Sequence, residues 1–138
     1  LVVPVVHRAE ELSFRSFIVA VEEKIKRVQN NQLNSHDVRN LSCTFNNTGI
    51  LGDVAPHSAI PCTRQNDGTI RPTVMAINMT KIRENADGHK YTNFVFRFDH
   101  RFCDGLVPAR FVNAMKDFLE AQKEPDDFLK FFDDDFKV

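Results

Sequence analysis

The sequence predicts an α+β domain, because runs with the two-residue period of a strand alternate with runs that have helical spacing. In residues 92–98, phenylalanine occupies every second position from Phe94, which is typical of a strand with one apolar face. Residues 106–121 then change to helical spacing, and residues 14–28 carry the clearest amphipathic pattern in the chain. With 138 residues, 42% of them hydrophobic, the chain is expected to form one domain or less around a core.

The N-terminal part is expected to place a strand before the first long helix. Residues 1–6 are almost entirely apolar and fit a buried strand, in which Pro4 is tolerated only at an edge or a bulge. Ser13 can cap the helix that follows, because its hydroxyl can accept a hydrogen bond from a free backbone N–H group of the first turn. Residues 30–34 are rich in asparagine and are expected to end this helix.

The middle of the chain is expected to form two further strands separated by a long loop. Residues 41–45 predict a strand that delivers residues 46–49 into a turn. Residues 53–72 contain three prolines and no periodic pattern, so they are interpreted as a loop. Residues 73–81 predict a central strand, and a turn within residues 84–90 leads back into the phenylalanine-rich strand as an antiparallel hairpin.

His100 and Asp104 lie in the short connection between the phenylalanine-rich strand and the last helix, where Gly105 gives the backbone freedom to turn. Imidazole titrates near neutral pH, so a histidine held on such a turn is a candidate general base. The alternative is that His100 is an ordinary surface residue of a turn that Asp104 caps.

Three blocks of the sequence carry a family resemblance. They are Asp99-His100-Arg101 with Asp104-Gly105 before Ala109-Arg110-Phe111, the apolar residues 1–6 with Ala9-Glu10-Glu11-Leu12-Ser13, and residues 41–52 with their glycine-containing turn. In this order they resemble the catalytic core of the dihydrolipoyl acyltransferases of 2-oxo acid dehydrogenase complexes. That family shares its fold with chloramphenicol acetyltransferase.

The resemblance implies a two-layer α/β sandwich, in which helices pack on one face of a mixed sheet. It also implies that residues 1–125 are the C-terminal portion of an acyltransferase core domain whose N-terminal part is missing from this chain. Within the long loop, residues 63–71 look like an insertion relative to the family. Residues 126–138 form an acidic and aromatic tail that is expected to dock on the domain or on a neighbouring subunit.

The chemistry that the resemblance implies is acyl transfer between dihydrolipoamide and coenzyme A. His100 would remove the proton from the attacking thiol, and Asp104 would hold the turn by a salt bridge. The family commonly has serine or threonine at the position of Asn46, where a hydroxyl donates to the tetrahedral oxyanion. The Asn46 amide can still donate, and Thr48 is a possible substitute. The alternative is that residues 46–49 are only a turn made of common turn formers.

The resemblance also implies partners. The family assembles as trimers with active sites between subunits, so a homotrimer or a larger core is expected, together with the other subunits of a 2-oxo acid dehydrogenase complex. A net charge of −1 gives no reason to expect a nucleic-acid or membrane partner. The odd number of cysteines, at unrelated spacings, favours reduced thiols in an intracellular protein over disulfides or a metal site. The expected location is the mitochondrial matrix in a eukaryote or the cytoplasm in a bacterium.

A second reading is a non-catalytic structural or docking subunit derived from the same fold. The missing N-terminal part, the asparagine at position 46 and the insertion favour it. The intact Asp99-His100-Arg101 and Asp104-Gly105 string argues against it, because a purely structural descendant has no chemical reason to keep that string. A drug acetyltransferase of the chloramphenicol type fits less well, because the same string and the block around Pro4 are closer to the dehydrogenase-complex branch.

Overall fold

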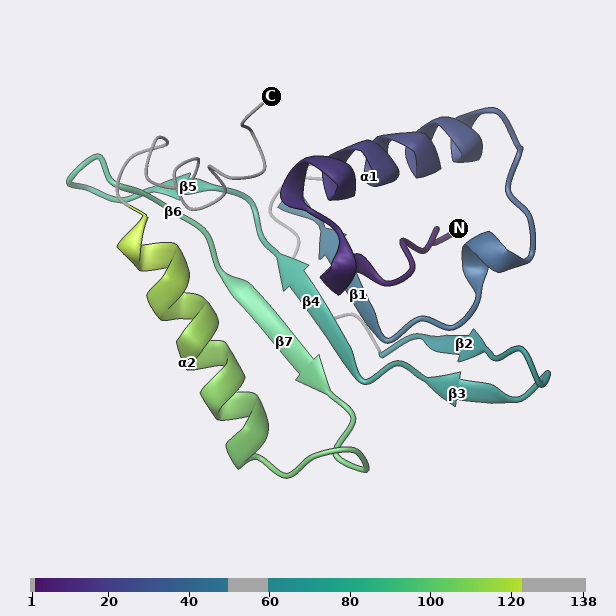
Figure 1. Ribbon diagram of the computed structural model, residues 1–138. Helices are drawn as coiled ribbons and strands as arrows, with labels where there is room; N and C mark the ends of the chain where they lie inside the picture. The colour runs from purple at the N-terminus through teal and green to yellow at the C-terminus, as the bar shows by residue number, and fades with distance from the viewer. Residues whose placement is uncertain (1, 50–59, 123–138) are drawn as a thin grey trace. The chain divides into compact units, whose positions relative to one another are not determined.

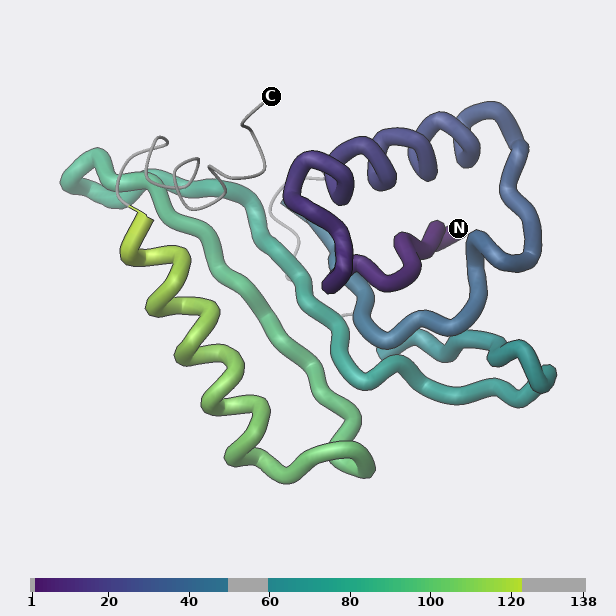
Figure 2. Tube along the Cα trace, viewed as in Figure 1, coloured from purple at the N-terminus to yellow at the C-terminus, as the bar shows by residue number. Residues whose placement is uncertain are grey.

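The computed structural model describes residues 2–49 and 60–122, and its chain forms two compact units (Figures 1 and 2). The first unit comprises Leu1–Arg39 and Asn113–Val138, and the second comprises Asn40–Val112.

The first unit contains helix α1, Phe14–Gln29, between two single turns of 3-10 helix, η1 (Ala9–Glu11) and η2 (His36–Val38). The predicted cap is confirmed, because the Ser13 hydroxyl accepts a hydrogen bond of 3.1 Å from the backbone N–H of Ser16. The helix also ends where the asparagine-rich segment predicts, since Asn30 is its C-terminal cap and Asn31 has a φ of 54°.

The strand predicted over residues 1–6 is wrong for the residues that the structure describes. Residues 2–6 enter no sheet, and Val2 and Val3 are exposed. A strand needs a neighbouring backbone with which to share a ladder of hydrogen bonds. The backbone N–H of Val5 instead donates to the carbonyl of Asp37, at 2.8 Å, so this apolar segment is tied to the turn η2.

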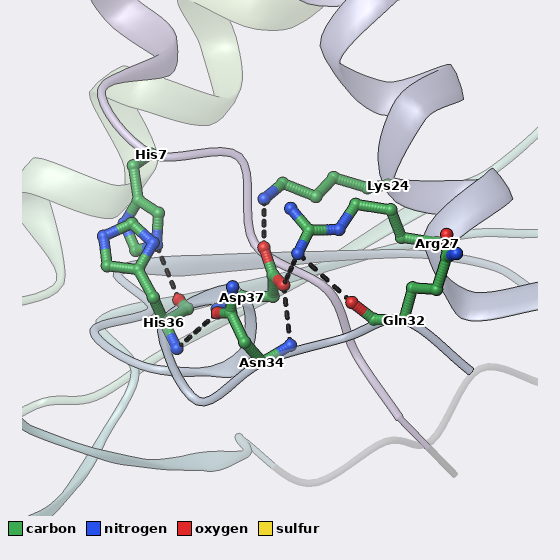
Figure 3. Close-up of polar contacts among 7 residues, drawn as sticks. All are labelled: His7, Lys24, Arg27, Gln32, Asn34, His36 and Asp37. Carbon is green, nitrogen blue, oxygen red and sulfur yellow. Dashed lines mark hydrogen bonds and ion pairs between the residues drawn. The ribbon is translucent and has the colours of Figure 1, made fainter. Parts of the chain in front are cut away.

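A buried carboxylate joins α1 to η2 (Figure 3). Asp37 is 1% exposed and pairs with Lys24 Nζ at 2.5 Å and with Arg27 Nη2 at 2.9 Å. The backbone N–H of Asn34 also donates to it, at 2.8 Å. These donors hold the pKa of Asp37 below its usual value, with the backbone bond from Asn34 first and the Lys24 bond second.

The second unit is built on a mixed three-stranded sheet in the order β1-β4-β7 (Figure 1). Strand β1 (Cys43–Asn47) runs parallel to β4 (Met75–Met79), and β7 (Phe94–Phe98) runs antiparallel to β4. The central position of β4 and its antiparallel connection to β7 are confirmed. The α+β class and the mixed sheet predicted from the sequence are confirmed as well.

One face of β7 carries the phenylalanine side chains that the alternation predicts. Helix α2, Leu106–Ala121, has the bounds predicted from its helical spacing. Its Phe111 ring meets the rings of Phe96 and Phe98 edge-on, with centroids 6.0 and 6.1 Å apart. These contacts fix the start of α2 on the phenylalanine face of β7.

Two hairpins extend the second unit. Strands β5 (Arg83–Glu84) and β6 (Lys90–Tyr91) pair in the predicted connection between β4 and β7. The loop predicted over residues 53–72 is wrong in its second half, because β2 (Cys62–Arg64) and β3 (Ile70–Pro72) form an antiparallel pair. Gly68 makes their turn possible with a φ of 82°. Residues 53–59 lie outside the described residues, as does the predicted tail over residues 126–138.

The described part of the chain buries more polar than apolar side chains. Ala76 and Ile77 are its buried apolar residues, whereas the polar side chains of Asn78, Thr73 and Asp37 are almost completely inaccessible. Buried polar groups normally need hydrogen-bond partners, which Asn78 and Asp37 have, whereas the Thr73 hydroxyl has none within the described residues. The described helices include none long and apolar enough to cross a membrane.

Candidate active site

The turn that carries His100 begins where β7 ends. The backbone N–H of Asp99 donates to the carbonyl of Val74 at 3.0 Å, and that of Phe102 donates back to the carbonyl of Asp99 at 3.0 Å. The first bond anchors the turn to the chain entering β4, and the second closes the turn on itself. His100 therefore projects from a backbone that is fixed on both sides.

A bidentate ion pair pins this turn. The Asp99 carboxylate is 8% exposed and accepts from Arg101 Nε at 2.9 Å and from Nη2 at 2.6 Å. The backbone N–H of Arg101 adds a third bond at 3.0 Å. Hydrogen bonds from Arg101 lower the pKa of Asp99 to about 2, so the carboxylate is ionised at neutral pH.

Asp104 has a role at the start of helix α2. Its Oδ1 atom accepts hydrogen bonds from the backbone N–H groups of Leu106, at 3.0 Å, and Val107, at 3.4 Å. Asp104 therefore caps the N-terminus of α2. Its negative charge also interacts favourably with the positive end of the helix dipole. Within residues 2–49 and 60–122, the ion pair that holds the turn joins Asp99 to Arg101, and the salt bridge of Asp104 stays a prediction.

The imidazole of His100 is exposed and makes no hydrogen bond to any described residue. It is therefore accessible from solvent, which the predicted role of general base requires. The cap formed by Asp104 serves the helix and does not reach the His100 ring. Within the same described ranges, no cluster of three histidine, cysteine or acidic side chains is placed to hold a metal ion.

Asn46 lies inside strand β1, which corrects its predicted place in a turn. Its Nδ2 atom donates to Oδ1 of Asn78 at 3.1 Å, across the β1–β4 pair. Thr48 follows the strand, and its hydroxyl donates to the carbonyl of Met79 at 3.0 Å. A hydroxyl has a single proton and an amide nitrogen has two, so Asn46 keeps a donor to offer while Thr48 has used its own.

The strand register places Asn46 and His100 toward opposite ends of β7. Asn46 is level with Val95 near the start of β7, whereas His100 follows the strand's last residue, Phe98. Three residues of strand separate these levels by about 10 Å, and His100 lies two residues further along. One copy of the chain therefore does not bring the predicted base and the predicted oxyanion donor together.

Sequence reasoning missed two features that shape this site. The string Asp99-His100-Arg101 was recognised, but the ion pair within it was not predicted. Asn78 was also missed, although an asparagine at the centre of a mainly apolar strand is itself a signal that a buried polar contact is present.

The family model of the 2-oxoacid dehydrogenases acyltransferase catalytic domain matches residues 1–128, and the chain belongs to this family. The resemblance drawn from the sequence is thus confirmed.

Two curated relatives come from Bacillus subtilis (strain 168). The chain is 31% identical over 132 residues to the lipoamide acyltransferase component of the branched-chain alpha-keto acid dehydrogenase complex, covering 90% of this chain and 29% of that protein. It is 27% identical to the dihydrolipoyllysine-residue succinyltransferase component of the 2-oxoglutarate dehydrogenase complex, covering 87% and 28%. The chain therefore spans less than a third of these relatives.

A solved structure shares the fold. A probable dihydrolipoamide acetyltransferase from Listeria monocytogenes superimposes with a TM-score of 0.67 at 22% sequence identity. The match covers 88% of this chain and 51% of the other. It supports the fold predicted from the resemblance.

Proposed function

We propose that the protein to which this chain belongs transfers an acyl group between dihydrolipoamide and coenzyme A, with His100 as the general base. Membership of the acyltransferase family supports the reaction class. The observation that carries the role of His100 is the open imidazole on a turn fixed by the Asp99–Arg101 pair. Coenzyme A and the lipoyl group are substrates in this proposal.

The reaction uses His100 twice. Its neutral imidazole takes the proton from one thiol, which has an ordinary pKa near 8.5 and is otherwise only slightly ionised at neutral pH. The thiolate attacks the thioester carbonyl of the other substrate and forms a tetrahedral oxyanion. When this intermediate collapses, the second sulfur leaves as a thiolate and takes the proton back from the imidazolium.

The oxyanion donor comes from a second copy of the chain. Asn46 lies beyond hydrogen-bond reach of a substrate at His100 of its own copy, because the two occupy opposite ends of the sheet. A closed trimer, in which each copy gives His100 to one interface and Asn46 to the next, would build three equal sites. Within such a site, the free N–H of Asn46 makes it a better donor than Thr48.

The test is transfer of acetyl, succinyl and isobutyryl groups from coenzyme A to dihydrolipoamide. His100→Ala should lower kcat by about a hundredfold or more, since a general base typically contributes 10²–10⁴-fold. His89→Ala is the matched control, because His89 is an exposed histidine in the turn between β5 and β6. The proposal fails if the folded wild-type protein has no turnover, or if both variants lose activity equally.

The second candidate is a non-catalytic subunit that docks into a 2-oxo acid dehydrogenase complex. It is favoured by the side-chain bonds that Asn46 and Thr48 already make within the chain. The same assay separates the two functions. A wild-type protein without turnover that still assembles with the other subunits of such a complex would establish the docking role.

A further inference from the structure

A ladder of side-chain amides crosses the sheet at one level, near the start of β7. Asn46 of β1, Asn78 of β4 and Val95 of β7 are register partners. Asn46 Nδ2 donates to Asn78 Oδ1 at 3.1 Å, and Asn78 Nδ2 donates to the carbonyl oxygen of Val95 at 3.3 Å. Asn78 is 0% exposed, so the middle of this ladder is shut off from water.

The backbone carbonyl of Val95 determines the orientation of both amides. The carbonyl of Val95 can only accept, so Asn78 must turn its NH₂ group toward β7. Its oxygen then faces β1, where it too can only accept. Asn46 is therefore obliged to present its own NH₂ group to β4, because its oxygen facing the oxygen of Asn78 would bring two acceptors together.

This orientation matters for the acyl-transfer site. Asn46 Nδ2 carries two protons and spends one on Asn78, and the second has no partner among the described residues. If the amide were reversed, an oxygen would stand where the nitrogen now is, and it would repel an oxyanion. The side chain that prevents the reversal thus controls whether Asn46 can donate.

A fully buried asparagine is costly in a strand unless its polar atoms are used. The neighbours of Asn78 along the strand, Ile77 and Met79, are apolar, and an aliphatic residue would suit the same burial. Asn78 therefore has a role that requires its polar atoms. Its oxygen accepts from Asn46, which, of the two predicted oxyanion donors, keeps an N–H without a partner among the described residues.

We infer that Asn78 is a positioning residue, which orients the amide of Asn46 so that its second N–H donates to the oxyanion of acyl transfer. This inference rests on the proposed function. Asn78 does not touch the substrate; it acts through Asn46. Its loss should therefore lower kcat and leave KM nearly unchanged, because the oxyanion exists only on the way through the transition state.

The test is a double-mutant cycle in the full protein. Asn78→Leu keeps the branched shape of the asparagine side chain, with larger methyl groups in place of the oxygen and nitrogen, and removes the two hydrogen bonds of the ladder. It should lower kcat by about ten- to a hundredfold, a loss smaller than or equal to that of Asn46→Ala. In the Asn46→Ala background, Asn78→Leu should have no further effect on kcat.

The control is Thr92→Val, which removes a part-buried hydrogen bond of 2.8 Å to the carbonyl of Thr80, two residues beyond Asn78 at the same end of the β4–β7 pair but outside the amide ladder. It should leave kcat unchanged. The inference is overturned if Asn78→Leu lowers kcat by the same factor with and without Asn46, or if Thr92→Val has an equal effect. Either result would assign Asn78 a general structural role.

A second measurement does not depend on turnover. In ¹⁵N-labelled protein, the two side-chain NH₂ protons of Asn46 should be further apart in chemical shift than those of an unbonded asparagine side chain, because one proton is hydrogen-bonded and the other is not. In Asn78→Leu these resonances should move together and their exchange with water should become faster. Unchanged resonances would refute the positioning role. If the wild-type protein is inactive, the proposed function fails, and this measurement alone decides the orientation of the amide.

Discussion

Mixing two inactive variants should restore activity if the proposed site lies between copies of the chain. His100→Ala removes the base and keeps Asn46, whereas Asn46→Ala removes the donor and keeps His100. The two residues lie at opposite ends of the sheet in one copy, separated by about 10 Å of strand and the turn beyond it. A hydrogen bond spans about 3 Å, so neither variant can complete a site alone.

The size of the recovery follows from symmetry. When equal amounts are unfolded together and reassembled at random, an interface is complete if one copy brings an intact His100 and the other an intact Asn46. Each event has a probability of one half, so about a quarter of the wild-type kcat should return. The assay is acyl transfer to dihydrolipoamide, with each variant reassembled alone as the control. Mixed samples no more active than the average of the two variants would refute a site shared between copies.

Three stability measurements test other parts of the structure. Gly49→Ala should lower the free energy of unfolding, measured in urea, by about 1–3 kcal/mol, because the added Cβ would stand 2.9 Å from backbone atoms after β4. Gly105→Ala is the control and should leave the free energy of unfolding unchanged, because no atom lies within 4 Å of its added Cβ. Asp37→Asn should cost more stability than Asp67→Asn, because Asp37 is buried between two cations and Asp67 is exposed; equal losses would contradict the role of the buried pair. The pKa of Asp99 is lowered from 3.8 to about 2, so its contribution to stability should be complete above pH 4 and be lost as the pH falls through about 2. The difference between wild type and Asp99→Asn in urea should therefore shrink across that range, and a constant difference would contradict it.

The helices could be predicted from the sequence because their signals are local. The Ser13 cap, the asparagines after Gln29 and the spacing of residues 106–121 each depend on atoms within a few turns of one helix. The alternation of phenylalanine in β7 is equally local, and the turn at Gly88 fixes its connection to β4. Such features can be predicted without knowledge of the tertiary structure.

The errors arise where a residue depends on a distant partner. Residues 2–6 have the composition of a strand, but a strand also needs a neighbour, which the sequence does not specify. The hairpin of β2 and β3 was hidden because each strand has three residues, too few to show a period. Asp99 and Asp104 are both acidic residues of one turn, and only the geometry shows which binds Arg101 and which caps α2.

Separate sets of contacts hold the two halves of the proposed site, and complementation depends on that separation. His100 is held by the Asp99–Arg101 pair and by the start of α2, at one end of the sheet. Asn46 is held at another level by Asn78, whose second bond ends on the backbone of β7. The substitution of His100 therefore leaves the amide ladder intact, and the substitution of Asn46 leaves the turn intact. Each inactive variant should retain one working half-site, which a wild-type half from another copy can complete.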